Sequence, residues 1–123
     1  MAAGVHDIII EQGARFVLEA TYTSDGTTPI NLTGYSGRGQ VRATATSAPV
    51  ASFTVTIPTP ANGVVRAVIE ADDTAAIPTD GANYSKTKVY YYDIELYTSD
   101  DADVIRLLNG KATVSPEITK PVA

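Results

Sequence analysis

The sequence of 123 residues contains no cysteine and no tryptophan, and it has one histidine and one methionine. Without cysteine, neither a disulfide framework nor a cysteine-based zinc site can form. The single histidine, His6, has no second histidine or cysteine with which to share a metal ion. We therefore do not expect His6 to belong to a metal cluster or a serine triad.

Long apolar runs and an excess of basic residues are also missing. No apolar run approaches the roughly 20 residues of a membrane-spanning helix, and residues 1–10 lack the basic start and apolar length of a signal peptide. The formal net charge is -5, from 9 basic and 14 acidic residues. This balance disfavours nucleic acid or an anionic membrane as a partner. We expect a soluble, unprocessed chain.

Short alternating segments separated by turn residues fill most of the sequence. In residues 14–23, Phe16 and Leu18 alternate with Arg15 and Val17, which is the pattern of a half-buried strand. Such segments, at the spacing seen here, predict an all-β, antiparallel immunoglobulin-like β-sandwich of about seven strands in a single domain, 1–123. The predicted strands are 5–11, 14–23, 36–46, 51–57, 64–71, 86–98 and 104–115.

One segment predicts a helix, and the end of the chain predicts an extended tail. A short helical turn is expected near 72–77, with Asp72 or Asp73 as its cap and Pro78 as its stop. The prolines of residues 116–123 predict that this tail is extended.

The predicted strand 36–46 carries unusually small residues on one face. Gly37 and Gly39 indicate close packing there, under the facing sheet or under a neighbouring subunit. They also form a G-x-G pattern, but Arg42 stands in the place of a third glycine and no helix follows. We therefore do not predict a dinucleotide site.

Residues 86–98 and 104–115 predict a long antiparallel hairpin. In its second strand, Ile105 and Leu107 have the opposite parity to Leu108, so one alternation cannot bury them all. We predict a β-bulge near Leu107 and Leu108, because one extra residue switches the inward parity of a strand. The expected buried residues are Tyr90, Tyr92, Ile94, Leu96, Leu108, Ala112 and Val114, with Gly110 leaving room for a ring.

The outer face of the hairpin carries a pair of carboxylates. Asp93 and Glu95 are about 7 Å apart by strand rise, which overlaps the carboxyl separation of inverting glycosidases. Alternating carboxylates on the exposed face of a strand also discourage edge pairing, and we expect this structural role here. No catalytic residue, cofactor or metal site is predicted.

Two other patterns are compatible with ligands. The acidic turn with Asp100, Asp101 and Asp103 has calcium-binding oxygens but lacks the glycine and distal glutamate of an EF-hand loop, so we expect a solvated turn. Tyrosines 90–92 are compatible with a sugar-stacking platform, although alternating tyrosines more often fill the core of a sandwich and its rim.

Several segments together resemble a known family. They are EQGARFVLEATY followed by INLTGY, then DDTAAIP, YDIELY and RLLNGKATVSPEIT. With them the chain resembles small tailed-bacteriophage virion structural proteins related to the N-terminal domain of the baseplate upper protein. The resemblance implies an immunoglobulin-like sandwich and a place in the phage particle. The baseplate protein carries more chain after this module, whereas this sequence ends at Ala123, so a receptor-presenting role is not implied.

The resemblance leads to a non-enzymatic, multicopy assembly module of the tail, baseplate or collar as the expected function. Its expected partners are other virion proteins and further copies of itself, and its expected location is the virion, assembled in the bacterial host cytoplasm. The alternatives are a head decoration (cement) protein that bridges capsid subunits, a glycan- or receptor-binding module, and a carboxylate-based hydrolase.

Overall fold

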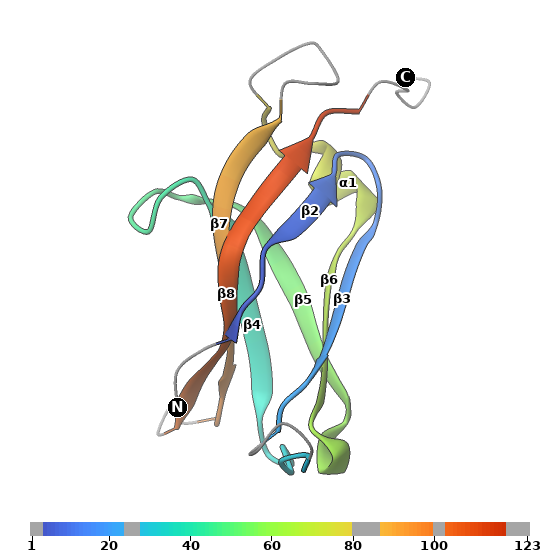
Figure 1. Cartoon of the computed structure of the whole chain (residues 1–123), viewed down its shortest axis with the longest axis vertical. Coiled ribbons are helices and arrows are strands. Elements are labelled where there is room, and N and C mark those ends of the chain that lie inside the picture. The colour runs from blue at the N-terminus through green and yellow to red at the C-terminus, as the bar shows by residue number, and fades with distance from the viewer. Residues whose placement is uncertain (1–3, 24–27, 80–86, 100–102, 118–123) are drawn as a thin grey trace.

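The structure is a computed structural model that describes residues 4–23, 28–79, 87–99 and 103–117. Strands dominate it (Figure 1). They are β1 (Gly4–Val5), β2 (Ile8–Glu11), β3 (Phe16–Thr21), β4 (Ser36–Arg42), β5 (Pro49–Thr59), β6 (Val64–Ile69), β7 (Lys88–Tyr97) and β8 (Val104–Ser115), with the short helices η1 (Pro60–Asn62) and α1 (Ala71–Ala75).

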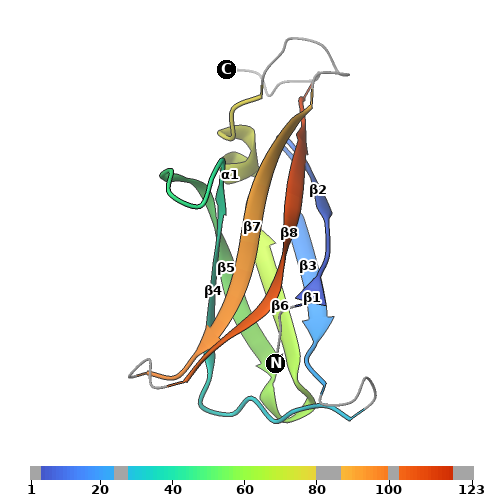
Figure 2. The same ribbon diagram turned by 60° about the vertical axis from the view of Figure 1, so that its left-hand side comes forward.

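The strands form two facing layers that share β5 (Figure 2). The order of hydrogen-bonded strands is β1-β8-β7-β4-β5-β6-β3, and β2 also pairs with β8. The first part of β5 pairs with β4 up to Phe53, and its second part pairs with β6 from Thr54 onward. The strand β5 therefore passes from one layer to the other and joins the two sheets.

This connectivity confirms the predicted all-β, immunoglobulin-like sandwich. One layer contains β3, β6 and β5, and the other contains β4, β7 and β8, which are the groupings of the B, E, D and C, F, G strands of immunoglobulin domains. The strand β2 pairs in parallel with the last strand, β8. Neither helix in the described part of the chain has the length and hydrophobicity needed to cross a membrane.

The core lies between the layers and is centred on Phe53. Its ring centroid is 6.2 Å from that of Phe16 on β3 and 5.8 Å from that of Tyr92 on β7, so Phe53 contacts strands of both layers. The predicted inward face of β7 is confirmed. Tyr90, Tyr92, Ile94 and Leu96 are all buried, as are Ala112 and Val114 of β8.

The predicted bulge in the hairpin is confirmed. Ile94 pairs with Leu108 whereas Glu95 pairs with Arg106, so Leu107 is the extra residue on β8. The extra residue is itself buried, and Leu108 is partly buried against the core. One inserted residue therefore lets both ends of β8 turn apolar side chains inward.

The small face of β4 packs within the chain rather than requiring a neighbouring subunit. A Cβ on Gly37 would lie 2.1 Å from Val55 of β5, and a Cβ on Gly39 would lie 2.7 Å from the backbone oxygen of Asp93. An aromatic ring was expected beside Gly110, but the neighbour is backbone instead. A Cβ added to Gly110 would lie 2.4 Å from the carbonyl oxygen of His6. The absence of a side chain at Gly110 thus lets the N-terminal strands approach β8.

Several predicted boundaries were wrong. The cap position of α1 is Glu70, without a side-chain hydrogen bond, and Asp72 and Asp73 lie in the first turn of the helix instead. Pro49 begins β5 and Pro58 lies inside it, although prolines were expected outside that strand. Prolines fit there because β5 leaves β4 and has an irregular register with β6 between Thr56 and Thr59.

A single glutamine connects three parts of the chain at the α1 end of the sandwich. Gln12 Nε2 donates to Ile77 O at 2.8 Å, and its Oε1 accepts from Glu117 N at 2.9 Å. Pro116 is buried beside this contact, so the described start of the predicted tail packs on the sandwich. The remainder of the tail, 118–123, lies outside the described residues.

Tyr90 joins β7 to the segment that follows α1. Its hydroxyl donates to Pro78 O at 2.6 Å, and the residue is 1% exposed. Immunoglobulin domains have a tyrosine at the corresponding corner, whose hydroxyl bonds back to upstream backbone. The position two residues later, where antibody domains carry a cysteine, is Tyr92 here.

We predict that Tyr90→Phe lowers the free energy of unfolding by about 1 kcal/mol, since it removes one partly buried hydrogen bond. Tyr91→Phe is the matched control, because Tyr91 is 51% exposed and its change should stay within about 0.5 kcal/mol. Urea unfolding of both variants measures the difference. Equal stability of the two variants would show that the Pro78 contact does not stabilise this corner.

We predict that Gly39→Ala lowers the free energy of unfolding by roughly 1 to 3 kcal/mol, because the new methyl group meets backbone of β7 and the ring of Phe53. Gly4→Ala is the control, since its nearest contact is the Leu108 side chain at 3.2 Å, which can move. Thermal unfolding of both variants tests this, and a fully stable Gly39→Ala protein would contradict the described packing of β4.

Candidate functional site

The outer face of the layer formed by β4, β7 and β8 is the candidate functional site. Alternate residues of these strands point away from the core, and on this face they are mostly charged or polar. Together they line an open groove of about 1160 Å³. Across the strands, the paired positions form the rows Arg38–Glu95–Arg106, Gln40–Asp93–Asn109 and Arg42–Tyr91–Lys111.

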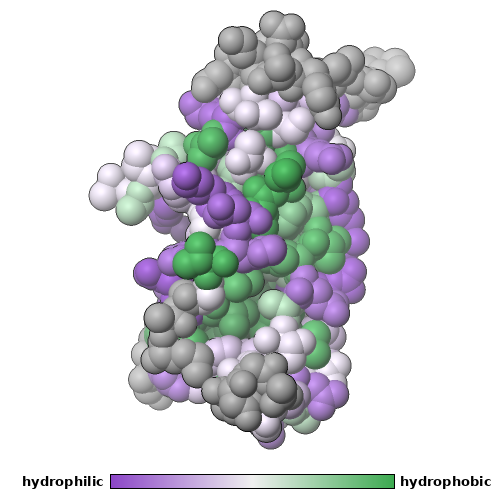
Figure 3. Space-filling view, viewed as in Figure 1, coloured by the Kyte–Doolittle hydropathy of each residue, from purple (hydrophilic) through white to green (hydrophobic). Residues whose placement is uncertain are grey.

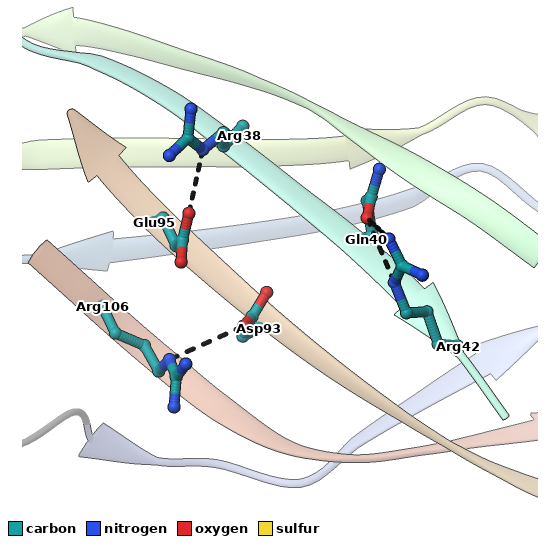
Figure 4. Close-up of polar contacts among 6 residues, drawn as sticks. All are labelled: Arg38, Gln40, Arg42, Asp93, Glu95 and Arg106. Atoms are coloured by element: carbon teal, nitrogen blue, oxygen red, sulfur yellow. Dashed lines mark hydrogen bonds and ion pairs between the residues drawn. The ribbon is translucent and has the colours of Figure 1, made fainter. Parts of the chain in front are cut away.

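Two ion pairs bind the carboxylates of this face to arginines of neighbouring strands (Figure 4). Arg38 Nε lies 2.8 Å from Glu95 Oε1, and Arg106 Nε lies 3.5 Å from Asp93 Oδ2. Arg106 thus reaches past its paired position, Glu95, to the next carboxylate. Because all four side chains are partly exposed, each pair contributes at most about 1 kcal/mol to stability.

Asp93 lines the groove, and the pKa of its carboxyl is perturbed there. Partial burial raises the pKa of Asp93 above its ordinary value, and the nearby Glu95 carboxylate raises it further. Arg106, Arg42 and Arg38 act in the opposite direction without cancelling these effects. The Asp93 carboxyl is therefore partly withdrawn from solvent.

Arg42 has only neutral hydrogen-bond acceptors. Its Nε donates to Gln40 Oε1 at 3.2 Å, and Nη2 donates to the same oxygen (Figure 4). Its Nη1 donates to Ser47 O. These contacts hold the guanidinium over β4. Among the described residues, no carboxylate forms an ion pair with Arg42, although Asp93 is close enough for Arg42 to lower its pKa.

Lys111 lies across β7 from Arg42, with Tyr91 between them. Its backbone N donates to Asp7 Oδ1 at 3.0 Å, which attaches the N-terminal segment to β8. No ion pair of the Lys111 side chain is found within the described part of the chain. The row therefore presents a ring that is 51% exposed, with a cation on either side.

His6 and Tyr92 meet at the edge of the same sheet. Tyr92 Oη donates to the carbonyl oxygen of His6, and His6 N donates to Asn109 O at 2.9 Å. Burial, together with the Asp7 carboxylate, raises the pKa of Tyr92 to about 12. The neutral phenol is thus maintained as a donor that fixes the N-terminal strand, and the contact uses the backbone of His6 rather than its imidazole.

The tyrosines of β7 do not form one stacking platform. Tyr90 and Tyr92 are buried in the core, as the alternation predicted, and Tyr91 alone of the three is exposed. Asp93 and Glu95 do lie together on the outer face, as predicted, but each one is bonded to an arginine.

The acidic turn is described in part. Asp100 and Asp101 lie outside the described residues, and so does most of the predicted solvated turn. Asp103 is described, and its carboxylate accepts a hydrogen bond from the hydroxyl of Tyr35. That bond is the main cause of the raised pKa of Tyr35. Among the described residues, no group of three or more histidine, aspartate or glutamate side chains is arranged to hold a metal ion.

Sequence reasoning missed that Arg106 and Lys111 belong to the same surface as Arg38 and Arg42. The alternation placed Arg38 and Arg42 opposite the glycines of β4, which identified that half of the face. The parity of Arg106 depends on the bulge at Leu107, and the pairing of β4 with β7 depends on the strand order. The sequence shows that both segments contain basic residues. Only the register between the strands shows that these residues lie on one face.

Comparisons with known proteins add little. No family model matches the chain, and no curated protein matches it. One solved structure that matches is of VGSC beta subunits, studied by photo-crosslinking for multimeric cell-adhesive interactions. Identity is 12%, the match covers 97% of this chain and 96% of that one, and the TM-score is 0.35. A TM-score at this level supports no inference about this protein, so the fold rests on its own strand order.

We predict that Asp93→Asn becomes more stable relative to the native protein as the pH rises above 3.8, the ordinary pKa of this group. The folded state holds the Asp93 proton more tightly than the unfolded state, so the native protein loses stability as pH rises through that window. The substitution removes this loss. Urea unfolding across acid and neutral pH measures it, with Asp72→Asn as the control for net charge. A difference that shrinks with rising pH would contradict the raised pKa.

Proposed function

We propose that this protein is a non-enzymatic structural protein of a tailed bacteriophage particle, present in several copies at the tail, baseplate or collar. The sequence segments that resemble baseplate-related virion proteins support the proposal. They contribute to β3, α1, β7 and β8, so they extend over both layers of the sandwich. The proposed partners are other virion proteins and further copies of the same chain.

The observation that carries the proposal is the composition and shape of the outer face of β4, β7 and β8. Protein interfaces are enriched in arginine and tyrosine, and this groove is lined by Arg38, Arg42 and Arg106 and by the exposed ring of Tyr91. The groove is open and extends over three strands, so it suits another macromolecule better than an enclosed small substrate.

The interior also favours a structural role. Tyrosines aside, Thr74 is the one polar residue that is buried among the residues that the structure describes. Its hydroxyl donates to Ala14 O at 2.8 Å and accepts from Gly13 N at 3.1 Å, which anchors α1 to the turn between β2 and β3. The buried hydroxyl of Thr74 therefore has a structural role, because it connects α1 to the β2–β3 turn.

Head decoration is the alternative location. A cement protein that bridges capsid subunits needs the same features, namely a small sandwich and a contact face rich in arginine and tyrosine. Exposed apolar residues on the N-terminal strands, namely Val5, which lines the groove, and Ile9, suit contacts in either place.

Quantitative mass spectrometry and labelling of purified particles test the proposal. We expect the protein in the particle, at a copy number that is a multiple of the rotational symmetry of the tail. A copy number of the order of the capsid subunits, with label over the head, would select the decoration role instead. Absence of the protein from purified particles would refute both.

A further inference from the structure

The groove on the outer face of β4, β7 and β8 has more positive than negative side chains, although the whole chain has a net charge of -5. The remaining residues therefore carry a net negative charge, which is opposite in sign to the net charge of the groove. The charged residues that line the groove are Arg38, Arg42, Arg106 and Lys111 against Asp7, Asp93 and Glu95.

Within this groove, the positive charge that remains for a partner is concentrated in one row. Asp93 forms an ion pair with Arg106, and Glu95 forms one with Arg38. The charged residues of the other two rows are therefore paired with one another. Arg42 and Lys111 have no ion pair among the described residues and lie on either side of Tyr91. The site therefore offers two cations flanking one exposed aromatic ring.

A matching acidic pair lies on another part of the same chain. Asp72 and Asp73 are exposed in the first turn of α1, and no ion pair of either is found within the described residues. Their neighbour Glu70 differs, since Arg15 Nε lies 3.2 Å from its Oε1. The helix α1, which carries this acidic corner, lies toward one end of the sandwich, whereas β4, β7 and β8 run along its length (Figure 1).

We propose that the Arg42–Tyr91–Lys111 row of one copy docks the Asp72–Asp73 corner of a second copy. The inference rests on the proposed function, because it names the self-contact of a multicopy assembly. The contact joins two different surfaces, so it is heterologous and produces rings or filaments rather than a closed two-fold dimer.

The spacing of the two pairs is compatible with simultaneous contact. Arg42 and Lys111 are separated by one strand, which places their backbones roughly 10 Å apart. Adjacent helical residues diverge by about 100°, so Asp72 and Asp73 can each meet one cation. The ring of Tyr91 then faces the exposed methyl groups of the same helical segment, Ala75 and Ala76.

Figure 3 shows one face of the molecule, on which hydrophilic and hydrophobic residues lie side by side. Attraction between exposed charges falls as salt screens them. We therefore expect the native protein to self-associate at high concentration in low salt and to dissociate when salt is added.

Sedimentation equilibrium of the native protein and two charge-reversed variants tests the docking. In Arg42→Glu/Lys111→Glu the face becomes acidic, and in Asp72→Lys/Asp73→Lys the corner becomes basic. Each variant alone brings like charges together, so its association should weaken by about tenfold or more. Because Arg42 also bonds to Ser47 O, Lys111→Glu alone is included and should cause a smaller loss.

Mixing the two variants distinguishes docking from a general effect of net charge. Every contact between unlike variants is then complementary, so association should return in the equimolar mixture. The matched control adds Glu11→Lys/Glu19→Lys to the face variant, which makes the same charge change at two exposed sites elsewhere. This control keeps an acidic face and an acidic corner and should stay dissociated, whereas adding Asp72→Lys/Asp73→Lys to the face variant should restore association. Circular dichroism of each variant verifies its fold.

Three outcomes would overturn the proposal. They are a native protein that stays monomeric at low salt, a mixture that fails to associate although both variants are folded, and equal restoration by the control variant. A monomeric protein whose Arg42 and Lys111 bind the acidic polysaccharide heparin would replace the second copy with a glycan. If association is absent but the protein is found in purified particles, only this inference fails and the structural role stands.

Discussion

The packing of Phe53 between Phe16 and Tyr92 is the contact on which the rest of the sandwich depends. It is possible because β5 belongs to both layers, so a side chain near its midpoint can contact strands of each sheet. Gly39 lies directly over this ring, and any larger residue there would separate β4 from β5 or from β7. The closeness of the two layers thus depends on one large ring and one missing side chain.

The same strands that fill the core produce the charged outer face. Alternation along β7 directs Tyr90 and Tyr92 inward and Tyr91 and Asp93 outward. Because the hairpin is long and regular up to its bulge, the outer residues of three strands align in rows. Ion pairs neutralise part of this surface, and the row around Tyr91 retains its positive charge.

The ends of the described chain are held by contacts that involve backbone atoms. Tyr92 attaches the N-terminal segment to β7, and Asp7 attaches it to β8. Gln12 joins Ile77, just after α1, to Glu117. These contacts make one edge of the sandwich a continuous parallel pairing of the first and last strands.

The sequence by itself determined the strands, the inward face of β7, the bulge at Leu107 and the sandwich class, because alternation and turn residues are local properties that survive without tertiary contacts. Only the tertiary structure decided that β5 is shared between layers, that Glu70 rather than Asp72 or Asp73 occupies the cap position of α1, and which basic residues share one face. The sharing of β5 and the grouping of the basic residues depend on strand order and register. Strand order is set by long-range packing of the core, and periodicity within a segment carries no information about it.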